Sequence, residues 1–226
     1  MYRKSWLAFS AGMAVCVLFL SGCQWTASRT EAEALLGEVA AKVDKEEPML
    51  KGHTVISMND QVIYRQEDVW YTSGPETSAR DAGAESQPAV KVPFMIEWDE
   101  LEEAAEEVEL MPSREGVAVL RVTLGSKAAE EMVIRYLEEN LDQVRVTVSN
   151  MDGTETAKQA AALLRDEEER MRDTLSTLSA FAEYRLHVDT ETREVRQLDA
   201  SVKLRYNKEG STVEETVTGS FRAVLP

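Results

Sequence analysis

Cysteine, histidine and aromatic residues are scarce in this chain of 226 residues, which has 2 cysteines, 2 histidines and 7% aromatic residues. His53 and His187 lie far apart in the sequence, and neither belongs to an HExxH pattern, so we expect both to be surface residues and no transition-metal site. The patterns GxSxG, GxGxxG and GxxxxGK[ST] are also absent from the sequence. We therefore expect no cofactor and no catalysis by an activated nucleophile.

Basic residues are also outnumbered, because the full chain has 25 lysines and arginines against 41 aspartates and glutamates. Such an acidic surface repels phosphates and anionic lipid headgroups. We therefore expect no binding to nucleic acid and no electrostatic adhesion to a membrane. An apolar content of 43% in a chain of this length is enough for a sizeable core.

No apolar run in the sequence reaches the roughly 20 residues that a membrane-spanning helix needs. The longest one, residues 7–20, follows the cations Arg3 and Lys4 and ends in the small residues Ser21 and Gly22. A basic start, an apolar stretch of about 7–15 residues and small residues at its end are typical of a secretory signal peptide. Residues 1–22 are therefore predicted to be a cleaved signal peptide.

Residues 20–23 read LSGC, which resembles the lipobox of bacterial lipoproteins. In that family the cysteine thiol is acylated and the chain is cut just before it. The resemblance implies lipidation of Cys23, a tether over residues 23–29 and a location on the extracytoplasmic face of the cell membrane. An ordinary secretory signal with an incidental cysteine is the alternative.

Removal of the signal would take Cys16, Arg3 and Lys4 away from the mature chain. Cys23 would then be the only cysteine, so we expect no disulfide framework and no site made of several thiolates. The remaining 23 basic and 41 acidic residues give a net charge of −18. Two or three acyl chains on one residue hold a protein stably on a bilayer, which makes the covalent anchor more necessary for this acidic body.

Residues 30–226 are predicted to form a single α+β domain. Apolar residues recur with helical spacing over 30–45, 99–108, 126–141 and 156–178. Apolar and polar residues alternate, or form short apolar runs, over 54–58, 62–65, 69–72, 117–125, 144–149, 184–188, 198–206 and 212–224, which predicts antiparallel strands. Residues 207–210 (NKEG) predict a hairpin loop, and residues 74–89 lack large apolar side chains and predict a mobile loop.

Five aromatic residues flank the segment 74–89, namely Tyr64, Trp70, Tyr71, Phe94 and Trp98. They could simply be core residues. The alternative is that some of them line an apolar groove between the sheet and the helices, where an acyl chain could bind.

Acidic residues cluster at 102–109 and 166–169. Paired carboxylates can hydrolyse glycosides when the fold holds them about 5–9.5 Å apart, but the sequence cannot establish such a distance. Neither cluster has the spacing of an EF-hand calcium loop. We interpret both clusters as solvated helix faces.

The order of elements and two short patterns resemble the LolA/LppX-type superfamily of bacterial envelope lipoproteins and carriers. The pieces at 62–65 and 69–72 resemble short strands of that family. In AEYRLHVDTETREVRQLDASVKLRY, the matching positions are Tyr184, Leu186, Val188, Asp189 and Thr192. The resemblance implies a curved antiparallel sheet, shaped like a half-barrel and closed by helices, that carries a lipid or a lipoprotein or has no known ligand. It implies no catalytic residue.

The leading hypothesis is a membrane-anchored, non-enzymatic lipoprotein that binds a lipid-like apolar ligand or an envelope partner. The first alternative is a structural or sensory interaction module, in which helix 156–178 or loop 74–89 contacts another envelope protein. The second is a cell-wall hydrolase, which would require carboxylates that converge in a cleft.

Overall fold

The computed structural model describes residues 29–46, 48–72, 98–111, 116–151 and 155–224, with residues 70–72 and 99 described by their backbone alone. Cys23, residues 23–28 of the predicted tether and the predicted loop 74–89 lie outside the described residues. Among the helices that are described, none combines the length and the apolar content needed to cross a bilayer.

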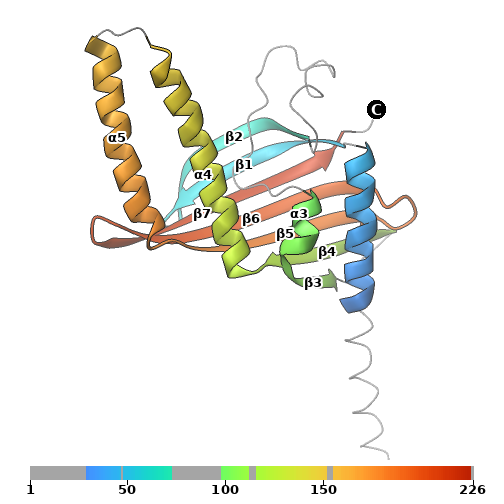
Figure 1. Cartoon of the computed structure of the whole chain (residues 1–226). Helices are drawn as coiled ribbons and strands as arrows, with labels where there is room; N and C mark the ends of the chain where they lie inside the picture. Colours follow the sequence, from blue (N-terminus) through green and yellow to red (C-terminus); the bar gives the residue numbers. More distant parts are fainter. Residues whose placement is uncertain (1–28, 47, 73–97, 112–115, 152–154, 225–226) are drawn as a thin grey trace, which may run out of the picture.

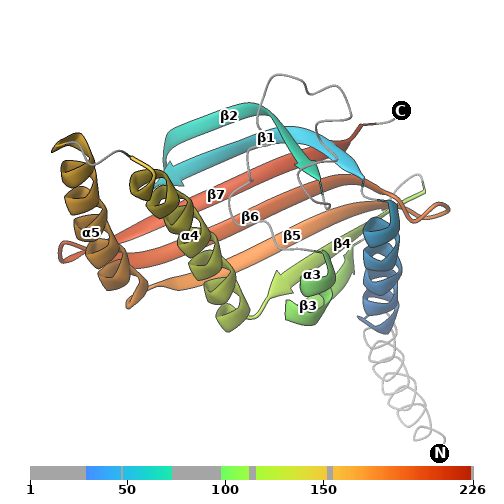
Figure 2. The ribbon, with the colours of Figure 1, turned by 45° about the horizontal axis from the view of Figure 1, so that its top comes forward.

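The fold is α+β and is built on one open antiparallel sheet of seven strands in the order β2-β1-β7-β6-β5-β4-β3. The sheet is curved, and its strands lie side by side in this order across Figure 2. Their bounds are β1 Met49–Met58, β2 Gln61–Thr72, β3 Ala105–Met111, β4 Val117–Leu124, β5 Ser179–Asp189, β6 Val195–Lys208 and β7 Ser211–Ala223. The expected half-barrel-like sheet fits this arrangement.

The described helices lie on one face of the sheet (Figure 1). They are an N-terminal helix over residues 29–46, α3 (Trp98–Ala104), α4 (Ser126–Ser149) and α5 (Glu155–Leu175). The helices cover one face because apolar and polar residues alternate along the strands. Every second residue of β4 and β5 is buried on the covered face. The other face of the sheet carries the polar residues of the alternation.

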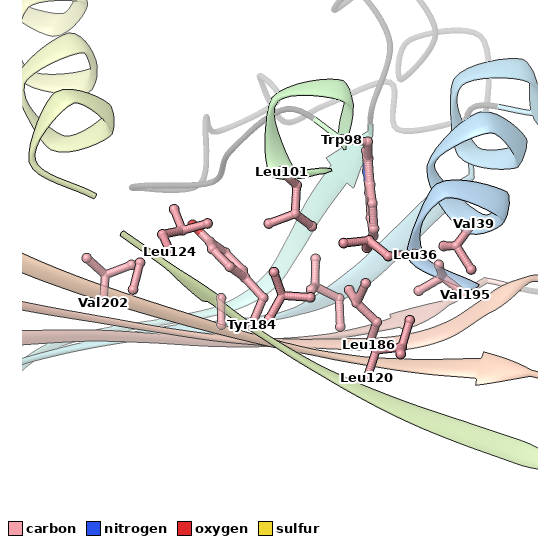
Figure 3. Close-up of a cluster of buried hydrophobic side chains, with 14 of the residues drawn as sticks. Leu36, Val39, Trp98, Leu101, Leu120, Leu124, Tyr184, Leu186, Val195 and Val202 are labelled. Carbon is pink, nitrogen blue, oxygen red and sulfur yellow. The ribbon is translucent and has the colours of Figure 1, made fainter. Parts of the chain in front are cut away.

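The core lies between the concave face of the sheet and these helices. Figure 3 shows Trp98 and Leu101 reaching down from α3 toward Leu120 and Leu186 on the strands. Tyr184 is fully buried in this cluster, and its hydroxyl donates a hydrogen bond to the sulfur of Met132 on α4 at 3.1 Å. The side chains of helices and sheet thus fill one continuous core.

Two tight turns join the hairpins. The β6–β7 loop consists of Glu209 and Gly210, whose φ angles are +52° and +79°. The β1–β2 loop consists of Asn59 and Asp60, with φ angles of +48° and +64°. Positive φ at both central residues gives a turn that matches the twist of the strands. The hairpin predicted at 207–210 is confirmed, with a loop of two residues instead of four because Lys208 already pairs with Ser211.

Two predictions about secondary structure are wrong, the first in part and the second entirely. The helix predicted over 99–108 ends at Ala104, because Val108 pairs with Val122 and extends the sheet as β3. The strand predicted over 144–149 is the last part of α4, where Arg145 pairs with Asp142 one turn earlier and with Glu168 on α5. Local alternation cannot tell whether a strand has a neighbour to pair with.

The region predicted as three short strands is instead the two-stranded hairpin β1–β2. Residues 66–68, expected to separate two strands, form an irregularity within β2 where the register with β1 shifts and Asp68 has a φ of +57°. A second register shift occurs near Tyr64. Bulges of this kind are common on edge strands, because they disturb pairing with other chains.

Candidate functional site

Of the five aromatic residues that could form either core or an apolar groove, the structure describes the side chains of Tyr64 and Trp98. Trp98 is 5% exposed and belongs to the core, whereas Tyr64 lies outside the core cluster and is 48% exposed on edge strand β2. Only the backbone of Trp70 and Tyr71 is described, and Phe94 lies outside the described residues. Trp98 is therefore a core residue and does not line a groove.

The concave face between the N-terminal helix and α4 is occupied by the protein's own side chains. Leu36 from the helix, Leu101 from α3 and Val133 from α4 are all buried against the strands. Two polar atoms in this interior, Oγ1 of Thr54 and Nε1 of Trp98, are buried without a hydrogen-bond partner. These side chains form a packed interior that stabilises the fold.

A cavity of about 590 Å³ lies at the rim of the sheet, where the end of the N-terminal helix meets the β5–β6 turn and the end of β7. We call it the rim cavity. The apolar part of its lining consists of Val43, Pro48, Met49, Val195, Ala223 and Val224. The charged part consists of Lys42, Glu46, Arg193, Glu194, Arg196 and Arg222. The volume is typical of a small-molecule site.

The β5–β6 turn positions one of these cations, Arg196, through Asp189. One carboxylate oxygen of Asp189 accepts hydrogen bonds from the backbone N–H groups of Glu191 and Thr192, each at 2.9 Å, and the other accepts from Arg196. The two backbone donors, followed by Arg196, lower the pKa of Asp189 to about 2. The aspartate therefore stays ionised and holds the turn and Arg196 in place.

The remaining cations of the lining differ in the number of hydrogen bonds and ion pairs that they make. Lys42 donates to the carbonyl oxygen of Thr192 at 2.6 Å and lies 3.5–3.6 Å from the carboxylates of Glu46 and Glu194. Arg193 pairs with Glu38 on the N-terminal helix at 2.9 Å and donates to the carbonyl of Thr190. The side chain of Arg222 has no partner in the part of the chain that the structure describes. It is therefore available for a ligand.

The charge of the lining is opposite to that of the neighbouring surface. The described helices together carry 20 acidic and 10 basic residues, whereas the rim cavity is lined by 4 basic and 2 acidic ones. Carboxylates just outside the lining, on Glu38 and Asp189, bring the acidic residues at the site to four, equal to the number of cations. The preference for an anion over a cation therefore comes from Arg222, whose side chain is unpaired in the described part of the chain.

A second exposed feature is the hairpin formed by α4 and α5, which we call the arm. Figure 1 shows α5 and the end of α4 standing away from the sheet. Arg145 on α4 joins the two helices by donating a hydrogen bond to Glu168 on α5 at 2.7 Å. It also donates to Asp142, and the hydrogen bonds to Glu168 and Asp142 raise the pKa of Arg145. The backbone N–H of Asn207 donates to Thr177 at the base of the arm. The arm thus has a defined shape.

The helix predicted over 156–178 is present as α5, but its apolar residues are packed less closely than their helical spacing indicates. No residue of α5 is buried, and among the described elements its main neighbours are α4 and β6. Its apolar stripe is half-buried along α4, while Leu163 is 65% exposed. A helix of 21 residues with no buried side chain has room to bind a partner.

The acidic clusters form no catalytic pair among the described residues. Most of their members are exposed, while Glu109 pairs with Arg121 and Glu168 with Arg145. The structure also shows no group of His, Cys, Asp or Glu suited to a metal within the residues that it describes. We therefore derive no hydrolytic mechanism from these carboxylates.

On the outer face of the sheet, a serine, an aspartate and a histidine meet in an order that does not suit catalysis. Ser220 donates to Asp199 at 2.6 Å, and His187 lies 3.3 Å from the same carboxylate. A catalytic triad needs the histidine between the other two, where it can take the serine proton. Here the aspartate is in the middle, so the serine is not activated.

Sequence reasoning did not find the rim cavity, because its cations come from three segments far apart in the chain. The DTETR turn was noticed only as a family resemblance. Comparison with known proteins adds nothing further, since no protein-family model, curated protein or solved structure matches the chain.

Proposed function

We propose that this protein is an extracytoplasmic lipoprotein, anchored to the cell membrane by lipid on Cys23, whose body binds another component of the cell envelope without catalysis. The LSGC sequence after a signal-like segment supports the anchor. The structure describes the N-terminal helix from Arg29 onward, six residues after Cys23, and the proposed tether is the short segment before it. A short tether keeps the folded body near the lipid headgroups.

The arm is the feature that best supports a protein partner. β6 spans 14 residues, about 45 Å, with one end beside Val43 of the N-terminal helix and the other at the base of the arm. Figure 2 shows the N-terminal helix and the arm at opposite ends of the strands. The single observation that carries this function is the complete absence of buried residues on α5.

The chemistry of the arm suggests what the partner would be. Together α4 and α5 carry 11 acidic and 7 basic residues, and Leu163 and Val146 are exposed apolar residues on them. A partner surface with basic groups around an apolar patch would complement it. We therefore propose a basic envelope protein as the partner.

Photo-crosslinking in intact cells tests this proposal. A photoreactive amino acid at Leu163 should give one dominant protein adduct, and the same probe at Phe181 on the outer face of β5 should not. Both positions are exposed, at 65% and 43%, so accessibility alone predicts equal labelling. Equal adducts at the two sites, or none at either, would refute the proposal that the arm binds a protein partner.

A lipid-like ligand is the second candidate, and two observations favour it. The curved, open sheet with helices on its concave face is the shape expected of the LolA/LppX-type superfamily, to which we propose a distant relationship. The rim cavity offers an apolar surface beside cations. Organic extraction of the purified protein followed by mass spectrometry tests this version, and an empty extract would count against it.

A further inference from the structure

Of the four cations that line the rim cavity, Arg222 alone has no partner among the described residues. Arg222 lies on β7 opposite Lys51 and Gln197, and its side chain is exposed and unpaired in the described part of the chain. Arg205 on β6 is also exposed, but it lines no part of the cavity. An unpaired arginine next to an apolar surface is available for an anionic group.

The other arginines of the lining keep donors free for a ligand. A guanidinium has five N–H donors. Arg196 uses one of its nitrogens to bind Asp189, and Arg193 uses two to bind Glu38 and the carbonyl of Thr190. Because these contacts hold both side chains in place, binding an anion would cost little additional ordering.

The apolar part of the lining restricts the ligand further. Val43, Val195 and Ala223 belong to the inner face of the helix and strands, and Met49 begins β1 beside them. A ligand that fills about 590 Å³ would therefore place an apolar body against these residues and its charge among the arginines. A free inorganic ion would leave most of the cavity empty.

We infer that the rim cavity binds a small organic anion, a carboxylate or phosphate monoester on an apolar body, and that Arg222 holds its anionic group. This inference rests on the ligand-binding version of the proposed function. It adds the class of ligand, the place where it binds and the residue that selects its charge.

A series of six-carbon probes tests the inference by calorimetric titration of the full chain with Cys23→Ser. Hexanoate and hexyl phosphate should bind, 1-hexanol should bind more weakly and hexylammonium weakest of all. Comparing hexanoate with hexyl phosphate identifies the preferred anionic group, and inorganic phosphate alone should bind poorly. Equal binding of hexanoate, hexanol and hexylammonium would overturn the assignment of an anion.

Two variants locate the anionic group. Arg222→Ala should weaken binding of the preferred anion about tenfold, as expected for loss of a charge-assisted hydrogen bond, and leave hexanol unchanged. Arg205→Ala is the matched control and should change neither. If anions bind but Arg222→Ala has no effect, this inference fails while ligand binding stands. If no probe binds, the ligand-binding version fails with it. Far-UV circular dichroism should be the same for both variants, because both side chains are exposed.

Discussion

Gly52 is the position where a single methyl group should do most damage to the sheet. It lies on β1 opposite Phe221 of β7, and an added Cβ would lie 1.8 Å from the carbonyl oxygen of Ser220 and 2.7 Å from Cα of Phe221. Both atoms belong to the backbone, so they cannot move aside as the end of a flexible side chain would. The two strands would have to separate.

The cost can be estimated from this geometry. Extra methylene groups in a well-packed core cost about 1–3 kcal/mol. A contact of 1.8 Å with backbone belongs at the upper end, so we expect Gly52→Ala to lower the free energy of unfolding by about 3 kcal/mol. For a chain of this size that corresponds to a thermal midpoint lower by about 6–12 °C.

Gly37 is the control within the same molecule. It lies in the N-terminal helix, where an added Cβ would meet only the carboxylate of Glu102, at 3.2 Å. Glycine in a helix costs about 0.5–1 kcal/mol relative to alanine. Gly37→Ala should therefore raise the thermal midpoint by about 1–4 °C.

Thermal unfolding followed by circular dichroism measures both variants of the purified protein. The reasoning predicts opposite signs for the same chemical change. If Gly52→Ala were as stable as the parent, β1 and β7 could not pair in the register described here. If both variants lost stability equally, the space around each glycine would not be the deciding factor.

Three further predictions concern single side chains. Thr54→Val should raise the free energy of unfolding by about 1 kcal/mol in denaturant titration, because it removes a buried hydroxyl without a partner, and a loss of stability would mean that the hydroxyl is bonded. Asp189→Asn should destabilise the fold at pH 5. The pKa of Asp189 is near 2 in the folded state and about 3.8 without its partners, so its stabilising effect is present above 3.8 and lost as the pH falls through 2. The thermal midpoints of parent and variant should therefore converge in acid, and a constant difference would contradict this assignment. Cys23→Ser should abolish labelling by palmitate and release the protein from membranes, and unchanged sedimentation with membranes would refute the anchor.

The strands of the second half of the chain could be predicted because each one carries its own alternation. Tyr184, Leu186 and Val188 are buried on one face of β5, as their spacing indicates. The hairpin at Gly210 could be predicted because a glycine there tolerates the positive φ of a tight turn. Local patterns sufficed where the local geometry and the tertiary fold agree.

The candidate sites could not be predicted in the same way. The apolar stripe of α5 indicates a helix, but nothing in its spacing tells that it packs on a single neighbour and stays half-buried. The aromatic residues were grouped by their proximity in the sequence, yet Trp98 joins the core and Tyr64 does not. The rim cavity unites Lys42 with Arg196 and Arg222, which both lie more than 150 residues later in the chain.

The sequence by itself determined the α+β class, the faces of most strands, the hairpin that ends at Gly210 and the N-terminal pattern on which the proposed anchor rests. These features depend on neighbours in the chain, through steric limits on φ and the two-residue period of a strand. Only the tertiary structure decided that residues 105–111 extend the sheet while 144–149 continue a helix, and that distant cations gather around one cavity. The reason is that a strand needs a paired neighbour and a cavity needs several walls, and both come from residues far apart in the chain.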